Sequence, residues 1–94
     1  MVITVNFLGV LRHISGAGEL ALNNEGALSI KELITEIVKE IPALKPSLIH
    51  RQLGDLRSNA LILVNSREIG VLNGLETNLK DGDKIVFIPV VHGG

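Results

Sequence analysis

The sequence predicts an α+β fold in which one main helix lies across one face of a β-sheet. Segments with the period of two that is typical of strands stand near both ends of the chain, and one segment with helical spacing lies between them. Two strands, a helix and then further strands is an order typical of α+β domains. The chain has 94 residues, 46% of them hydrophobic and 20% charged, which is enough for a single domain over residues 1–94 and too little for a second.

The chain opens with two predicted strands. Residues 2–8 form the first, because large apolar side chains recur at every second position: Ile3, Val5 and Phe7. Leu8 is then an apolar residue on the opposite, mostly polar face. Residues 19–22 form a second, short strand that follows a glycine-rich segment and precedes a turn at residues 23–26.

Residues 29–41 predict the main helix. Ser29 is a good N-cap, and Glu32 three residues later completes a capping box. Apolar residues at alternating spacings of three and one form a single stripe: Ile30, Leu33, Ile34, Ile37, Val38 and Ile41. Pro42 ends the helix.

The second half of the chain returns to strands. Residues 47–53 are expected to form a short helical turn after Pro46. The continuous apolar run at 60–65 predicts a buried strand, and residues 68–69 predict the second arm of a hairpin. A tight turn at 81–83 starts the last strand, 84–88, which Pro89 is expected to end.

Composition excludes several classes of function. Without cysteine, the chain has no disulfide, thiol nucleophile, Cys-type zinc site or iron–sulfur cluster. Nine basic and ten acidic residues, with two phenylalanines as the only aromatics, do not make a nucleic-acid-binding surface. Charges interrupt every apolar stretch, and the N-terminus lacks the features of a signal peptide, so we expect a cytoplasmic protein without membrane contact.

Catalysis by this chain alone is not expected. The sequence shows no Ser-His-Asp arrangement and no phosphate-binding glycine loop. The histidines, His13, His50 and His92, lie far apart and lack the spacing of metal ligands, so no metal site is expected.

The chain stops on Gly93-Gly94, shortly after a strand and a proline. Glycine has no Cβ, so a diglycine tail suits passage through a narrow active site of a partner. We expect residues 89–94 to form a flexible tail, which could reach about 20 Å when extended. The diglycine could also be incidental, in which case the domain would be a small binding module.

Four segments together resemble the MoaD/ThiS family of ubiquitin-like sulfur carriers. Residues 7–12 are similar to the family's first strand with its trailing arginine, and residues 65–69 to its strand-turn segment. Residues 74–85 resemble the family signature before the last strand, and residues 87–94 its ending. The match is most like the small, sulfur-carrying subunit of molybdopterin synthase.

The resemblance implies a β-grasp fold, with the first and last strands parallel and adjacent. It also implies that an adenylating enzyme of the ubiquitin-activating type uses ATP to activate the carboxylate of Gly94. A sulfur donor then displaces AMP and leaves a thiocarboxylate. In the molybdopterin branch, the tail inserts into the large subunit of the synthase and gives up its sulfur in molybdenum cofactor biosynthesis. The chain would then be a sulfur-donating, non-catalytic subunit that binds no cofactor itself.

The resemblance also implies partner-binding residues. Leu8 and Ile88 match a hydrophobic docking patch on the sheet, and Ile69 is expected to join them. Arg12 matches a family arginine that would support tail or partner contacts.

The tail itself departs from the family pattern. Val90 replaces a second proline, and Val91 and His92 lead into Gly93 and Gly94. An ending of His-Gly-Gly is similar to that of ubiquitin-related modifiers, whose partners are target-protein lysines or the tRNA thiolation machinery. Conjugation to lysines and sulfur transfer for tRNA therefore stand as alternatives to molybdopterin synthesis.

Overall fold

The computed structural model describes residues 1–49 and 60–90 of the chain. The strands are β1 (Val2–Phe7), β2 (Glu19–Asn23), β3 (Leu28–Ser29), β4 (Ala60–Val64), β5 (Arg67–Glu68), β6 (Asn78–Leu79) and β7 (Lys84–Pro89). The α-helices are α1 (Gly9–Ser15), α2 (Ile30–Glu40) and α3 (Lys45–Leu48), and the 3-10 turns are η1 (Pro42–Leu44), η2 (Ile69–Val71) and η3 (Gly74–Glu76).

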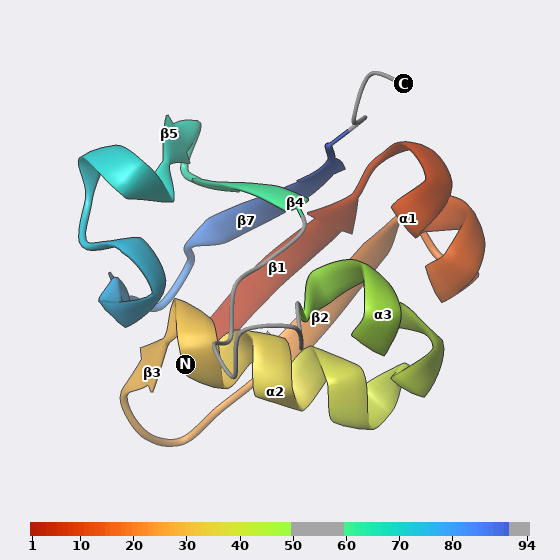
Figure 1. Cartoon of the computed structure of the whole chain (residues 1–94). Helices are drawn as coiled ribbons and strands as arrows, with labels where there is room; N and C mark the ends of the chain where they lie inside the picture. The colour runs from red at the N-terminus through yellow and green to blue at the C-terminus, as the bar shows by residue number, and fades with distance from the viewer. Residues whose placement is uncertain (50–59, 91–94) are drawn as a thin grey trace.

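The main sheet has five strands in the order β2-β1-β7-β4-β5 (Figure 1). β1 and β7 are parallel neighbours at its centre, and the other pairs are antiparallel. The register places Val5 opposite Ile85 and Phe7 opposite Phe87. A second, two-stranded sheet pairs β3 with β6. The predicted α+β class and the parallel pairing of the first and last strands are both confirmed.

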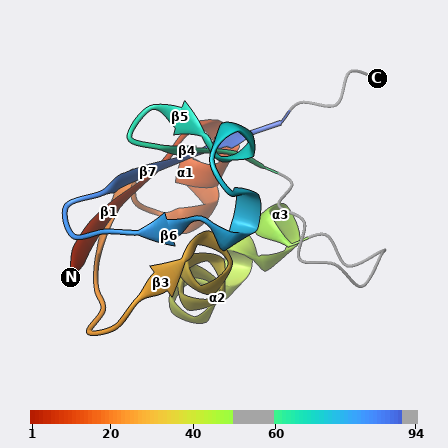
Figure 2. The same cartoon turned by 90° about the vertical axis from the view of Figure 1, so that its left-hand side faces the viewer.

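The helix α2 packs across one face of the main sheet (Figure 2). Ser29 caps it as predicted: its side chain accepts a hydrogen bond from the Glu32 N–H at 3.2 Å, and the Glu32 carboxylate accepts one from the Ser29 N–H at 3.1 Å. Its apolar stripe is buried against the alternate residues of the strands: Ile3, Val5, Phe7, Ile62, Val64, Ile85 and Phe87. Burial of each such side chain contributes about 1.5–3 kcal/mol.

A helix that the sequence analysis did not predict follows β1. α1 starts at Gly9, whose φ of 56° turns the chain off the sheet, and ends at Gly16 with φ of 76°. β1 therefore ends at Phe7 rather than Leu8. Seven residues are too few for a stable isolated helix, and Leu11, only 1% exposed, attaches α1 to the core.

Two elements of the second half are displaced from their predicted bounds. α3 covers Lys45–Leu48, earlier than the predicted 47–53, most of which lies outside the described residues. β5 covers Arg67–Glu68, and Ile69 begins η2 instead of ending the hairpin.

The last strand includes Pro89, which lies opposite Ala60 on β4. Proline lacks an N–H. The Phe87 carbonyl accepts a hydrogen bond from the Leu8 N–H at 3.1 Å, so Phe87 directs its backbone groups toward β1. Because backbone groups alternate along a strand, the position of Pro89 that has no donor also faces β1. β1 has already ended at Phe7, so no ladder bond is lost. Pro89 therefore belongs to the strand, one residue beyond the predicted end at 88. The flexible tail stays a prediction.

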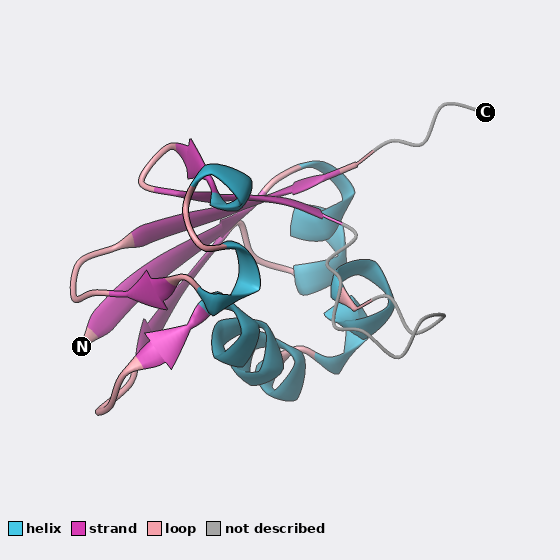
Figure 3. Cartoon of the chain, turned by 60° about the vertical axis from the view of Figure 1, so that its left-hand side comes forward, coloured by secondary structure: helices cyan, strands magenta, loops and turns pink. Residues whose placement is uncertain are grey.

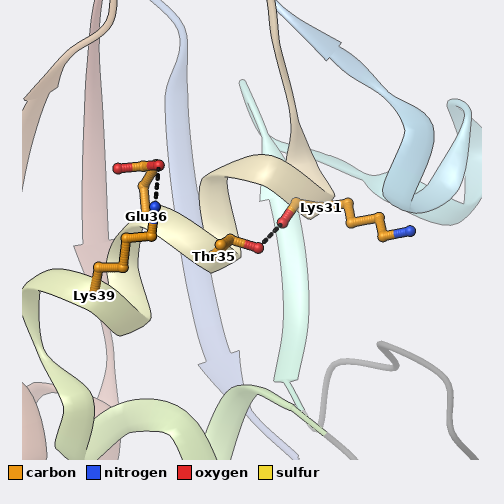
Figure 4. A network of polar contacts seen from close by, with 4 residues as sticks. All are labelled: Lys31, Thr35, Glu36 and Lys39. Carbon is orange, nitrogen blue, oxygen red and sulfur yellow. Dashed lines mark hydrogen bonds and ion pairs between the residues drawn. The ribbon is translucent and has the colours of Figure 1, made fainter.

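We expect Ser29→Ala to lower the free energy of unfolding by about 1 kcal/mol, because the N-cap bond is lost at a site that is almost fully buried. Urea denaturation followed by far-UV circular dichroism measures it. Thr35→Ala is the matched control on the same helix. Its exposed hydroxyl only donates to the Lys31 carbonyl (Figure 4), so a change within about 0.5 kcal/mol is expected. Equal losses in the two variants would contradict the capping assignment.

Candidate functional site

The face of the sheet opposite α2 is covered by none of the described helices (Figure 3). The side chains there are the alternate residues of the strands, which are exposed or half-buried. Apart from Val2 on β1 and Ala21 on β2, its apolar members lie on β4, β7 and the residue after β1. We call these five residues the apolar face: Leu8, Leu61, Leu63, Val86 and Ile88.

Backbone pairing brings the apolar face together. Leu61 lies opposite Ile88, and Leu63 lies opposite Val86. Leu8 is extended (φ −109°, ψ 159°), so its side chain continues the alternation of β1 one position beyond the Phe7–Phe87 pair. Leu8 and Leu61 are 43% and 39% exposed. Adjacent exposed apolar side chains of this kind form a surface suited to binding another protein.

The apolar face adjoins the place where the chain leaves the sheet toward its C-terminus. Ala60 and Pro89 follow directly on the Leu61–Ile88 pair. Pro89 also packs against Gly9, where an added Cβ would lie 3.0 Å from the Pro89 Cγ. A protein bound to this face is therefore also beside the start of the C-terminal segment.

The structure brings together only some of the residues that the sequence analysis selected. Leu8 and Ile88 lie on the apolar face. Ile69 does not: it is 9% exposed and belongs to the core, because η2 turns it inward after β5. The expectation that Ile69 joins an exposed patch is corrected.

Arg12 and Val90 lie beside this face rather than on it. Arg12 projects from α1, and an added Cβ on Gly18 would come within 3.0 Å of its Nε, so Gly18 leaves room for the guanidinium. Val90, 48% exposed, lines a small hollow with Val10 and Pro89. The other selected residues, Val91, His92, Gly93 and Gly94, lie outside the described residues.

Sequence reasoning missed Leu61 and Leu63. It assigned the whole run 60–65 to a buried strand, whereas β4 buries only Ile62 and Val64. A period of two within a continuous apolar run cannot be read from hydrophobicity alone. The pairing of Leu61 with Ile88 assigns it to the open face.

The described parts of the chain hold no group of three or more His, Asp or Glu side chains that could bind a metal ion. Among the same residues, no helix is long and apolar enough to cross a membrane.

The family model described as Urm1 (Ubiquitin related modifier) matches residues 2–94. The chain belongs to the Urm1 family. The predicted resemblance to ubiquitin-like sulfur carriers is thereby confirmed at the level of the wider group. Its assignment to the molybdopterin synthase branch stays a prediction.

Individual relatives agree with the family match. The chain is 33% identical to ubiquitin-related modifier 1 of Schizosaccharomyces pombe, with both chains covered in full. It is 31% identical to a putative sulfur carrier protein of Archaeoglobus fulgidus, over 82% of this chain and 85% of that one. The solution structure of small archaeal modifier protein 1 from Methanosarcina acetivorans superimposes with a TM-score of 0.82 at 32% identity, covering 99% of this chain and 96% of that chain.

Neighbouring residues on β4 test which face is open. We expect Ile62→Ala to cost about 2–5 kcal/mol of unfolding free energy, because it leaves a cavity in the core. Leu61→Ala, on the opposite face, should cost less than about 1 kcal/mol. Urea denaturation of both variants measures the difference. If Leu61→Ala were as damaging as Ile62→Ala, the open face would be disproved.

Proposed function

We propose that this member of the Urm1 family is a sulfur carrier and protein modifier that acts through the carboxylate of Gly94. The observation that carries the proposal is the position of the apolar face at the exit of the C-terminal segment. An adenylating enzyme that holds Leu8, Leu61 and Ile88 would also receive the diglycine end in its active site. Membership of the family supports the same chemistry.

The proposed chemistry has two steps. The Gly94 carboxylate attacks the α-phosphorus of ATP, and pyrophosphate leaves, so that an acyl-adenylate is formed. A sulfur nucleophile at the oxidation level of sulfide then attacks the carbonyl carbon, and the C–O bond to AMP breaks. The products are AMP and a thiocarboxylate on Gly94. Activation is needed because a free carboxylate has no good leaving group.

Three acceptors are compatible with the proposal. The family match over residues 2–94 and the ending His92-Gly93-Gly94 favour attachment to target-protein lysines and sulfur transfer to tRNA. The motif at residues 74–85 favours sulfur transfer to a molybdopterin precursor in the large subunit of molybdopterin synthase. All three acceptors would use the same activated Gly94.

Deletion of Gly94 is expected to abolish thiocarboxylate formation, because the reacting carbonyl is displaced from the active site of the enzyme. Intact-mass spectrometry, with activating enzyme, ATP and sulfur donor present, should show a gain of about 16 mass units on the full chain only. A full chain that never gains this mass disproves the sulfur-carrier function.

In cells, loss of higher-mass lysine conjugates on deletion of Gly94 indicates a modifier, and loss of molybdopterin indicates the synthase branch.

Leu8→Glu is expected to slow adenylation of the chain by about tenfold or more, because it places a carboxylate within an apolar contact. ATP–pyrophosphate exchange by the activating enzyme measures the rate. Val71→Glu is the matched control, since Val71 is 75% exposed and lies on η2, outside the apolar face. Equal effects of the two variants would show that the apolar face does not receive the enzyme.

A further inference from the structure

The outer edge of β2 is the longest open edge of the main sheet in the described chain. β2 stands at one end of the strand order and pairs only with β1 (Figure 1). The opposite edge is formed by β5, which has only two residues before η2 begins. An extended segment from another protein could therefore pair along β2 but scarcely along β5.

The pairing with β1 shows which backbone groups are free. The Phe7 N–H donates to the Gly18 carbonyl and the Asn24 N–H donates to the Met1 carbonyl, both at 2.9 Å. In an antiparallel pair, bonded positions alternate along each strand. The even-numbered residues of β2 therefore bond to β1, and the odd-numbered residues direct their N–H and C=O groups outward: Glu19, Ala21 and Asn23. No hydrogen bond within the described residues uses these outward groups.

β2 has few of the features that commonly protect sheet edges, and its one charged residue is Glu19. Natural edges are blocked by short strands, lysine, proline or bulges. β2 has five residues, Glu-Leu-Ala-Leu-Asn, in unbroken register with β1. Its half-buried Leu20 and Leu22 also pack against the core, so alternate apolar side chains of an added strand would extend that surface.

The surroundings of this edge are acidic. Glu19 lies on β2 and Glu25 in the turn that follows it. Beyond the turn, a hollow of about 430 Å³ between residues 24–28 and α2 is lined by Glu32 and Glu36. Two cations adjoin these acids. The Arg12 guanidinium lies against Gly18, directly before β2, and the Lys39 Nζ lies 3.5 Å from a Glu36 carboxylate oxygen (Figure 4). The side chains of Lys39 and Glu36 are largely exposed, so their ion pair contributes little. The four carboxylates outnumber the two cations, Arg12 and Lys39, and the area is net negative.

We propose that the open edge of β2 binds an extended, positively charged segment of a partner protein as an additional strand. Backbone hydrogen bonds to Glu19, Ala21 and Asn23 would hold it, and its basic side chains would lie near the acidic residues. The acidic surroundings oppose pairing with a second copy of the same edge, because like charges would meet. This surface is separate from the apolar face and does not depend on Gly94.

Amide hydrogen exchange on the full chain tests the proposal. The probe is a ten-residue peptide of alternating lysine and valine, and its control has glutamate in place of lysine. With the lysine peptide in excess, exchange at Ala21 and Asn23 should slow by about tenfold or more. The glutamate peptide should leave it unchanged.

Three outcomes would overturn the proposal. One is no slowing with the lysine peptide, and another is equal slowing with both peptides. The third is protection without peptide that rises with protein concentration, which would assign the edge to a second copy.

Ala21→Pro removes one outward N–H at an edge position where proline is tolerated. It should abolish the protection at Asn23, whereas Ala21→Val, which keeps the N–H, should bind as the wild type does.

If Ala21→Pro does not fold, Glu36→Gln gives a second test. It should weaken binding of the lysine peptide about two- to threefold at low salt, whereas Glu76→Gln on η3 should not. Unchanged binding in Glu36→Gln would contradict the proposed role of charge.

Discussion

The parallel pairing of β1 with β7 is the contact on which the rest of this protein depends. It joins residues 4–7 to residues 84–87 across nearly the whole chain. Phe7 and Phe87 stack with ring centroids 5.8 Å apart and are at most 1% exposed. The turn before β7 extends the contact, since the Thr4 N–H donates to the Asp83 carbonyl and the Val2 N–H to the Asp81 carboxylate. In the main sheet, β2 is added on the β1 side of this pair, and β4 and β5 are added on the β7 side.

The same pairing gives the chain its functional geometry. Because β1 and β7 run in one direction, Leu8 and Ile88 reach the same end of the sheet, beside the start of the C-terminal segment. The apolar face and the start of the C-terminal segment at Pro89 are thereby adjacent although Leu8 and Pro89 are far apart in sequence. One end of the sheet thus carries both the apolar face and the start of the C-terminal segment. The core on the other face, under α2, buries the alternate side chains of the same strands.

How far sequence reasoning reached depended on the range of the interactions involved. The capping box of Ser29 and Glu32 and the stripe of α2 were predicted because they arise within a few residues of each other. α1 was missed because its seven residues gain their stability from burial of Leu11 in a core made by distant segments. Ile69 was placed on the surface because no local pattern shows that η2 turns it inward.

The sequence by itself determined the local chemistry: the alternation of β1 and β7, the main helix with its cap, the absence of thiols and the diglycine ending. Only the tertiary structure decided which face of β4 is open, so that Leu61 contributes to the apolar face while Ile62 is buried. It also decided that β2 stands at an open edge. The physical reason is that hydrophobicity and turn signals act over a few residues, whereas exposure is set by which distant strands pair and which face the helix covers.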